Sequence, residues 1–478
     1  MKKFLITLSV LFFCGILTAQ SDLDAFRFSQ TQWEGSARFM GAGGAFGAVG
    51  AEYSALAINP GTIGLYKRHE VTLTPLVLDV QKSNTQYNET NMQAAKTSYM
   101  ISNAGIVLKA NTREESKWNG VQFAFGFNRI LDLNKRFAID GFGNGSTITD
   151  NFIRNSSGLP SGLSEDNLGA WWTYLTDYDT ASNSYSSPFT GKNVKQKELT
   201  TMKGGIDEMN FSLGANYDDK FYMGLTVGVP FIHYEEIRTY SELDENKEVD
   251  ALAGLDIRDN LSVSGTGINL KLGFIYQPVD FFRVGIALHT PTYYGGITDK
   301  FQRTITSDYD IGDGAKYECP ENFFKYKLYT PLRAIGSIAF MLQSRAFISV
   351  DYEYTDYSLS QLYSKDYSFA TENEEIQAKY GSAHSVRIGG EVFVTKSFLL
   401  RAGYNFISNP YKDKNINNAP MHQGSIGFGV RTSGFFFDMA YVLRFAKENY
   451  WMYDPTLVNA SQNSYRTSKI VATIGYKF

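Results

Sequence analysis

The segment Phe435-Phe-Phe-Asp-Met-Ala-Tyr-Val-Leu-Arg-Phe445 places a large apolar residue at every second position, with Asp438, Ala440 and Arg444 between them. Successive side chains of a β-strand point to opposite faces of the sheet, so this segment predicts a strand with one apolar and one polar face. The segments 398–406 and 470–478 show the same alternation. Such strands suit a transmembrane barrel, because its outer face meets lipid and its inner face lines a polar lumen.

About fourteen such segments follow one another along the chain. The predicted strands are 69–80, 99–109, 119–130, 208–217, 220–230, 267–277, 281–289, 333–342, 346–355, 385–394, 397–406, 423–431, 434–444 and 468–478. The connections alternate in length: tight turns are predicted at 218–219, 278–280, 343–345, 395–396 and 432–433, and long loops at 131–207, 231–266, 290–332, 356–384, 407–422 and 445–467. Short periplasmic turns, long external loops and periplasmic termini are the features of an even-stranded outer-membrane barrel.

The composition agrees with a barrel and argues against other classes of protein. The 478-residue chain is 15% aromatic, with 31 Tyr and 35 Phe, and its mean hydropathy is −0.25. A soluble all-β sandwich also has alternating strands, but it predicts neither the alternation of long and short connections nor large aromatic residues along the outward face. The net charge of −4 provides no basic surface for nucleic acid.

The first residues are typical of a secretory signal peptide. Met1-Lys-Lys3 precedes an apolar run from Phe4 to Leu17, and we expect cleavage after Ala19. The run is too short for a membrane anchor, and no later run reaches the ~18 apolar residues of a membrane helix. Cleavage would leave Cys319 as the lone thiol, to which we assign no function.

Residues 35–61, GSARFMGAGGAFGAVGAEYSALAINPG, are too small for an ordinary core and too apolar for a linker. Glycine permits close backbone approach and backbone angles that other residues avoid. We therefore interpret 20–68 as a plug threaded through the lumen, and 69–478 as the barrel. Because the plug precedes the first strand, we expect it on the periplasmic side, where it would gate the exit of a ligand.

The longest predicted loop contains a short stretch with helical periodicity. Leu168, Trp171, Trp172 and Leu175 recur at i, i+3, i+4 and i+7 after a possible N-cap, Ser164. We expect an amphipathic helix outside the membrane. Its apolar stripe either packs onto neighbouring loops or offers a landing surface to a hydrophobic ligand.

Alternation directs a set of charged residues into the lumen. They are Lys271, Arg283, Asp351, Glu353, Arg387, Glu391, Arg401, Asp438 and Arg444. These groups either form ion pairs that brace the wall or supply a cation to the carboxylate of an amphipathic ligand, and we choose Arg387 and Arg401 as candidate ligand contacts. The five histidines lack metal-ligand spacing and no nucleophile motif occurs, so we expect no metal, cofactor or catalytic site.

Two parts of the sequence resemble a known family. Ser36-Ala-Arg-Phe-Met-Gly-Ala-Gly-Gly-Ala-Phe46 and Ala55-Leu-Ala-Ile-Asn-Pro60 resemble the N-terminal signature of the FadL family of outer-membrane long-chain fatty-acid transporters. The ending Tyr476-Lys-Phe478 is similar to the aromatic signal read by barrel-assembly machinery. The resemblance implies a fourteen-stranded barrel with an N-terminal hatch. It also implies ligand capture at external loops, passage to a lumen pocket and sideways release through the wall when the hatch rearranges.

The resemblance implies roles for particular residues of the plug. The hatch and gating residues would be Arg38, Gly41, Gly43, Gly44, Asn59 and Pro60. Gly61 stands where the family's Asn-Pro-Ala motif has alanine. Members take up long-chain fatty acids or aromatic hydrocarbons, and several similar Bacteroidetes proteins carry a hemin-receptor label.

Passive uptake of a hydrophobic small molecule is the leading hypothesis, with a long-chain fatty acid as the expected ligand. Because the same type of barrel also includes a shuttle protein of a secretion system, a non-transporting scaffold for secreted proteins is one alternative, and a hemin receptor is another. The other expected partners are outer-membrane lipid and, through Phe478, the barrel-assembly machinery. We expect a monomer.

Overall fold

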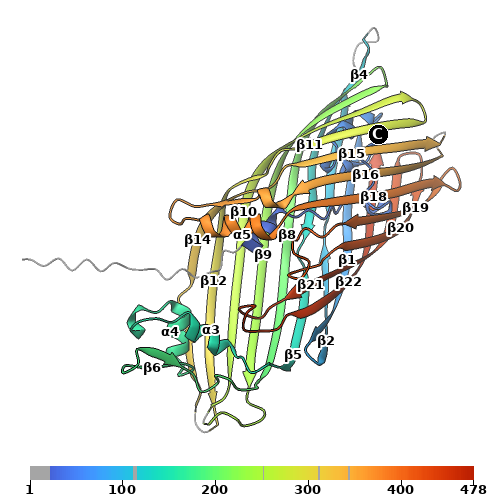
Figure 1. The fold of residues 1–478 in the computed structure, drawn as a ribbon. Coiled ribbons are helices and arrows are strands. Elements are labelled where there is room, and N and C mark those ends of the chain that lie inside the picture. Colours follow the sequence, from blue (N-terminus) through green and yellow to red (C-terminus); the bar gives the residue numbers. More distant parts are fainter. Residues whose placement is uncertain (1–21, 111–115, 251, 311–312, 343–344) are drawn as a thin grey trace, which may run out of the picture.

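The barrel predicted from the sequence is present in the computed structural model, which describes residues 22–110, 116–250, 252–310, 313–342 and 345–478 (Figure 1). Within these ranges, fourteen antiparallel strands follow one another around a closed barrel. The last strand pairs with the first from Glu70 with Lys477 to Gln86 with Gln462. The predicted signal peptide lies outside the described residues.

The barrel strands agree with the predicted set in number and order. They are β1 (Glu70–Tyr87), β3 (Asn103–Ala110), β4 (Trp118–Asp132), β8 (Lys195–Tyr217), β9 (Phe221–Leu243), β10 (Leu252–Val279), β11 (Phe282–His289), β15 (Arg333–Leu342), β16 (Ala346–Asp356), β18 (Ser382–Phe393), β19 (Phe398–Ile407), β20 (Met421–Arg431), β21 (Phe435–Tyr450) and β22 (Ser461–Lys477). Short turns join them at one end, near the C-terminus in Figure 1, and the long connections lie at the other.

An apolar band on the outer face marks where the barrel meets lipid. On β10 the outward side chains Ile268, Leu270, Leu272, Phe274 and Tyr276 are each 37–51% exposed, although all five are apolar or aromatic. A nine-residue band agrees with the ~9–11 residues that a tilted strand needs to cross a bilayer. The structure therefore has the fold of a bacterial outer-membrane barrel.

The long connections contain most of the remaining elements. These are β2 (Thr90–Met100), β5 (Lys135–Phe142), α3 (Ile148–Arg154), η3 (Pro160–Gly162), α4 (Glu165–Trp172), β6 (Asp177–Asp179), β7 (Ser184–Ser186), β12 (Tyr293–Tyr309), β13 (Ala315–Glu318), β14 (Asn322–Tyr329), η4 (Tyr357–Leu359), β17 (Gln361–Tyr363) and α5 (Ala370–Lys379). Among the described residues, none of the helices has the length and hydropathy needed to span a bilayer.

The prediction that 231–266 is a loop is wrong. Strand β9 continues to Leu243 and β10 begins at Leu252, so the two form one long hairpin. Outward residues of β10 above the apolar band, such as Ser262 and Ser264, are polar and exposed. The apolar alternation ends at the membrane boundary because water surrounds the upper part of the hairpin, while its backbone pairing continues.

The plug predicted for the N-terminal region lies inside the barrel as α1 (Asp22–Ser29), α2 (Ala37–Gly41), η1 (Tyr53–Ala57) and η2 (Pro60–Leu65). Helix α1 lies beside α5 at the extracellular end, where the ring of Phe26 stacks on Tyr380 with centroids 4.5 Å apart. Segment η2 packs against the other end of β8, where a Cβ on Gly64 would lie 2.7 Å from the carbonyl oxygen of Ala215. The plug therefore runs from the periplasmic end of the lumen to the level of α5, and the core beneath α3 and α4 contains no plug residue among those described.

The apolar band predicts how substitutions on β10 affect stability. Leu272→Lys puts a charge at the centre of the band, and we expect it to lower the free energy of unfolding by ~2–4 kcal/mol in phospholipid vesicles. The matched variant Ser264→Lys lies on the same face above the band and should cost less than ~1 kcal/mol. Urea titration measures both values, and equal costs would show that the band is misplaced.

Candidate functional site

The plug touches the barrel wall backbone to backbone. Gly43 and Gly44 have φ angles of +66° and +76°, in the left-handed region that favours glycine. A Cβ added to Gly43 would lie 2.8 Å from the backbone nitrogen of Tyr404. On the wall, a Cβ added to Gly403 would lie 2.2 Å from the backbone nitrogen of Gly43. Neither surface has room for a side chain at this contact, so Gly43 of the plug docks on Gly403 of the wall, while Gly44 packs against Phe39 and the Arg387 side chain.

The glycines on the wall were not among the predicted site residues. Gly389 on β18 pairs directly with Gly403 on β19. A Cβ on Gly389 would lie 1.9 Å from the carbonyl oxygen of Ala42. The sequence does carry a signal for this dock, since both glycines occupy lumen-facing positions of adjacent predicted strands. The signal identifies the dock only when the pairing register of β18 and β19 is known, because the register brings Gly389 opposite Gly403. The predicted Gly41 lies beside this contact. A Cβ added to Gly41 would lie 3.5 Å from the Cα of Gly427.

A chain of buried ion pairs holds the plug to the same part of the wall. Arg38 donates hydrogen bonds from Nε and Nη2 to the two oxygens of Glu391, at 3.0 and 2.9 Å. Glu391 also accepts from Arg401 at 2.5 Å, and Arg401 pairs with Asp438 at 2.7 Å. The Arg401 side chain is fully buried. Its geometry is that of a wall brace, so contact with a ligand would require these pairs to open.

Asn59 and Pro60 fasten the last turn of the plug to β9 and β10. The Asn59 amide donates to the carbonyl oxygens of Phe274 on β10 at 3.3 Å and of Gly47 in the plug at 2.6 Å, and its own oxygen accepts from the Gly61 N–H at 2.9 Å. A Cβ on Gly224 would lie 2.1 Å from the carbonyl oxygen of Pro60. Gly61 itself lies against β10, where an added Cβ would be 3.0 Å from the Phe274 nitrogen. The glycine at position 61 therefore relieves a crowded contact that alanine would tighten.

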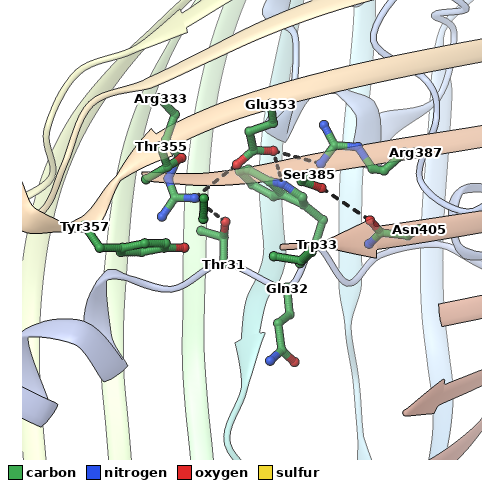
Figure 2. Close-up of a pocket in the computed structure, with 12 residues that line it drawn as sticks. Thr31, Gln32, Trp33, Arg333, Glu353, Thr355, Tyr357, Ser385, Arg387 and Asn405 are labelled. Atoms are coloured by element: carbon green, nitrogen blue, oxygen red, sulfur yellow. Dashed lines mark hydrogen bonds and ion pairs between the residues drawn. The ribbon is translucent and has the colours of Figure 1, made fainter. Parts of the chain in front are cut away.

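Arg387 lies in a second buried cluster, around Glu353 (Figure 2). Glu353 accepts from Arg387 at 2.8 Å and from Arg333 at 3.1 Å, and the Trp33 indole N–H donates to it at 3.0 Å. Arg333 also donates to the carbonyl oxygen of Ser29 in the plug. Trp33 and Arg333 thus hold Glu353 against Arg387, and the ion-pair partners of Arg387 among the described residues, Asp351 and Glu353, are both carboxylates of the wall.

A third buried cluster holds the plug to β21 and β22. Glu34 accepts from Lys469 at 2.6 Å and from Arg444 at 3.1 Å. Lys469 also pairs with Asp132 at 2.7 Å and with Asp79 at 3.5 Å. All these side chains are at most 9% exposed. The plug therefore contributes one carboxylate, Glu34, to a network that otherwise belongs to the wall, and no sequence pattern identifies Glu34 as the partner.

Two cavities lie along the plug, and both are small. One, of about 20 Å³, is lined by Trp33, Arg333 and Arg387, and the other, of about 30 Å³, by Phe28, Lys271 and their neighbours. Because a single water needs roughly 10–15 Å³ of such space, each cavity has room for no more than about three waters. Neither can hold a fatty acid, and a ligand can pass these points only if the plug moves.

The wall has a seam beside β2. In the described part of the chain, β2 pairs only with β1, and β5 pairs only with β8. Side chains bridge the facing edges: Lys96 Nζ donates to Asn134 Oδ1 at 3.0 Å and to the carbonyl oxygen of Met202. Tyr99, at the end of β2 nearer the periplasm, is 62% exposed. Side-chain contacts can separate without breaking a β-ladder, so β2 and β5 are held together less firmly than the hydrogen-bonded strands on either side of them.

The predicted helix in the longest loop is α4. It begins after Ser164, whose carbonyl accepts the Leu168 N–H at 2.8 Å, although the Ser164 side chain makes no capping bond. Leu168 and Trp171 are half-buried, Trp172 is 54% exposed, and Leu175, beyond the helix end, is fully buried. The predicted stripe is therefore divided between packing on the loops and an exposed indole.

Cys319 lies beneath the same loop region. Its thiol is buried and lies 3.7 Å from the carbonyl oxygen of Glu165. Burial raises the pKa of the Cys319 thiol to about 12, so it remains protonated at neutral pH. A protonated, buried thiol is a poor nucleophile, in keeping with a packing role.

The fold and the lumen contacts define an outer-membrane barrel occluded by its own N-terminal segment. No family model and no curated protein matches the chain. Solved structures do match. A Pseudomonas aeruginosa FadL homologue has 14% identity and a TM-score of 0.57, and the Pseudomonas putida toluene transporter TodX has 13% and 0.55. The Ralstonia pickettii toluene transporter TbuX has 16% and 0.50. Each match covers 94% of this chain and 99% of the other, and these identities establish likeness of fold.

The backbone dock predicts the effect of one added methyl group. In Gly403→Ala the new Cβ would overlap the Gly43 nitrogen, so we expect the plug to shift, with a loss of ~1–3 kcal/mol in stability and a higher ion conductance across planar bilayers. The control Gly424→Ala adds a methyl group to the neighbouring strand where no atom lies within 4 Å, and it should leave conductance unchanged. If both variants conduct like the parent, the dock does not seal the lumen.

Proposed function

We propose that this protein is a member of the FadL and TodX group of channels and mediates passive uptake of hydrophobic small molecules across the outer membrane. The observation that carries the proposal is the backbone dock of Gly43 on Gly403, a seal without interlocking side chains, inside a barrel similar to hydrocarbon channels. Van der Waals contact between flat glycine surfaces can separate without rotamer changes. The proposed ligands are long-chain fatty acids or molecules like them.

Capture takes place at the extracellular loops. Trp172 on α4 exposes 54% of its surface, beside the half-buried Trp171, whose ring centroid lies 5.1 Å away. Exposed aromatic rings bind apolar molecules with little loss of conformational entropy because the rings are rigid. The ligand then descends into the upper lumen, where Arg387 is a cation available to a carboxylate once the Glu353 cluster rearranges.

Exit takes place sideways, through the seam between β2 and β5. The dock seals the periplasmic half of the lumen, so movement of the plug exposes the wall beside Glu34 and Lys469. Lys469 pairs there with Asp132, at the end of β4 that adjoins the seam. An apolar ligand that leaves at this level enters lipid directly and avoids the aqueous periplasm.

A reversible lock tests whether the plug must move. A Cβ on Gly41 would lie 3.4 Å from Ala440 Cβ, close to the ~3.5–4.5 Å of a disulfide. We expect Gly41→Cys with Ala440→Cys to stop uptake of radiolabelled oleate by whole cells when oxidised. Reduction should restore the parental rate, since the cross-link alone holds the plug.

The variants that carry one of the two added cysteines, Gly41→Cys and Ala440→Cys, are the controls and should be insensitive to oxidant, because the native Cys319 thiol is buried in the loop region. Surface binding of oleate to purified protein should persist in the locked form, because capture precedes plug movement. Uptake that continues in the locked protein would rule out gating by the plug. Binding without uptake in the unlocked parent protein would instead favour a scaffold that does not transport.

The exposed indole predicts a separate effect on capture. Trp172→Ser removes apolar surface from the loops, and we expect ~3–10-fold weaker oleate binding, comparable to the loss of one partly buried aromatic side chain. Leu359→Ser, at a residue that is 62% exposed in a different connection, is the control. Fluorescence titration with a fatty-acid probe measures both variants. Equal affinities would exclude α4 from the capture surface.

A further inference from the structure

The lipid-facing wall carries an apolar groove of about 1110 Å³ on β16 and β18–β21. Its outward-facing lining includes Ile348, Ile388, Leu400, Tyr404 and Ile426, which are 44–62% exposed. The outside of a barrel is normally convex. A hollow of this size is comparable with ligand pockets, which run to about 300–1,000 Å³.

Small residues at one register level create the hollow. Ile348 pairs with Gly390, Gly390 pairs with Ala402, and Ala402 pairs with Ile426 across four adjacent strands. Directly paired side chains lie on the same face of a sheet about 4.5–5.5 Å apart. Across the four strands, two small residues, Gly390 and Ala402, therefore lie between two large ones, Ile348 and Ile426. The isoleucines form the walls of the groove, and the glycine and alanine form its floor.

The periplasmic end of the groove is cationic. The turns below it place Arg345 and Lys396 in exposed positions. The carbonyl of Arg345 accepts the Phe393 N–H at 2.8 Å, so the two turns lie side by side. Neither 343–345 nor 395–397 contains an acidic residue. An apolar trough that ends at two cations complements an amphipathic molecule with an anionic head.

The other side of the barrel has a smaller apolar groove, and the turn at its periplasmic end contains acidic residues. It is about 340 Å³ in volume, and Leu108, Phe123 and Phe211 contribute to its lining. The turn between β8 and β9 beneath it contains Asp218 and Asp219, with Lys220 pairing with Asp218 at 3.6 Å. The barrel therefore offers two apolar hollows, of which only the larger has an acid-free cationic turn below it.

We propose that the larger groove is a specific site for an anionic glycerophospholipid of the periplasmic leaflet. The acyl chains lie on the floor formed by Gly390 and Ala402, and the phosphate head lies at Arg345 and Lys396. Cations near a membrane surface attract anionic lipid headgroups, whereas a zwitterionic head gains little from them. The acyl chains would lie outside the lumen, because Ile348, Ile388, Leu400, Tyr404 and Ile426 face outward, while Glu391 and Arg401 reach the groove only from the lumen side of the same strands.

Native mass spectrometry of the full chain tests this site. The protein is purified in mild detergent and titrated separately with phosphatidylglycerol and phosphatidylethanolamine. We expect one retained phosphatidylglycerol, bound about tenfold more tightly than phosphatidylethanolamine. Ala402→Trp, which fills the floor, and the pair Arg345→Glu with Lys396→Glu should each reduce its affinity about tenfold or more.

Leu108→Trp and Lys220→Glu make the matching changes at the smaller groove and should leave retention unchanged. If Ala402→Trp does not fold, as judged by heat-modifiable migration on gels, the two turn substitutions decide the result because they lie outside the membrane wall. Equal retention of both lipids, or retention unaffected by the turn variants, would overturn the proposal. A protein dimer that Ala402→Trp abolishes would also overturn it, by assigning the groove to a second copy.

Discussion

The position of the plug in the lumen depends on contact between two glycine surfaces, one on the plug and one on the wall. Gly43 needs its left-handed backbone to present its nitrogen to β19, and Gly403 needs to lack a Cβ to receive it. A protein interior is packed like a crystal, so even one methyl group at such a contact has to displace backbone. The plug is built to fit this contact. Its helix α2 is short, and the residues nearest the wall, Gly41, Ala42 and Gly43, are small.

Buried charges fix the plug in register with that contact. Arg38 and Glu34 lie on either side of the glycine-rich segment's entry, and each meets its counter-charge on the wall. Removing one partner of a buried pair commonly costs about 3–5 kcal/mol, because the other charge is left without compensation in a medium of low polarity. The glycine surfaces bring the two backbones into contact without side chains between them, while the ion pairs define the position of the plug.

The membrane part of the fold could be read from the sequence, because lipid on one side and a polar lumen on the other impose alternation. Residues such as Leu270 and Leu272 carry that signal. Outside the membrane the alternation of apolar and polar residues ends, so the sequence pattern predicts a loop where β9 and β10 form a hairpin.

The site was predictable only in part, for a different reason. The glycines of the plug could be identified, since a run of small residues is unusual in itself. Their partners could not, since Gly389 and Gly403 become a surface only when two strands pair in register. Lys469 and Glu34 are 435 residues apart, and no local pattern predicts that they meet. Alternation correctly predicts that Arg401 faces the lumen. It does not predict that Glu391 and Asp438 are the ion-pair partners of Arg401.

Hydrogen exchange of the plug measures the central claim directly. The full-length protein in lipid nanodiscs would be followed by mass spectrometry, with and without saturating oleate, over the peptides that span 37–47. The account predicts slow exchange in the free protein, because these amides are buried against the wall, and at least tenfold faster exchange when ligand is bound. Exchange that is equally slow in both states would contradict it, since the plug would then be a fixed part of the barrel.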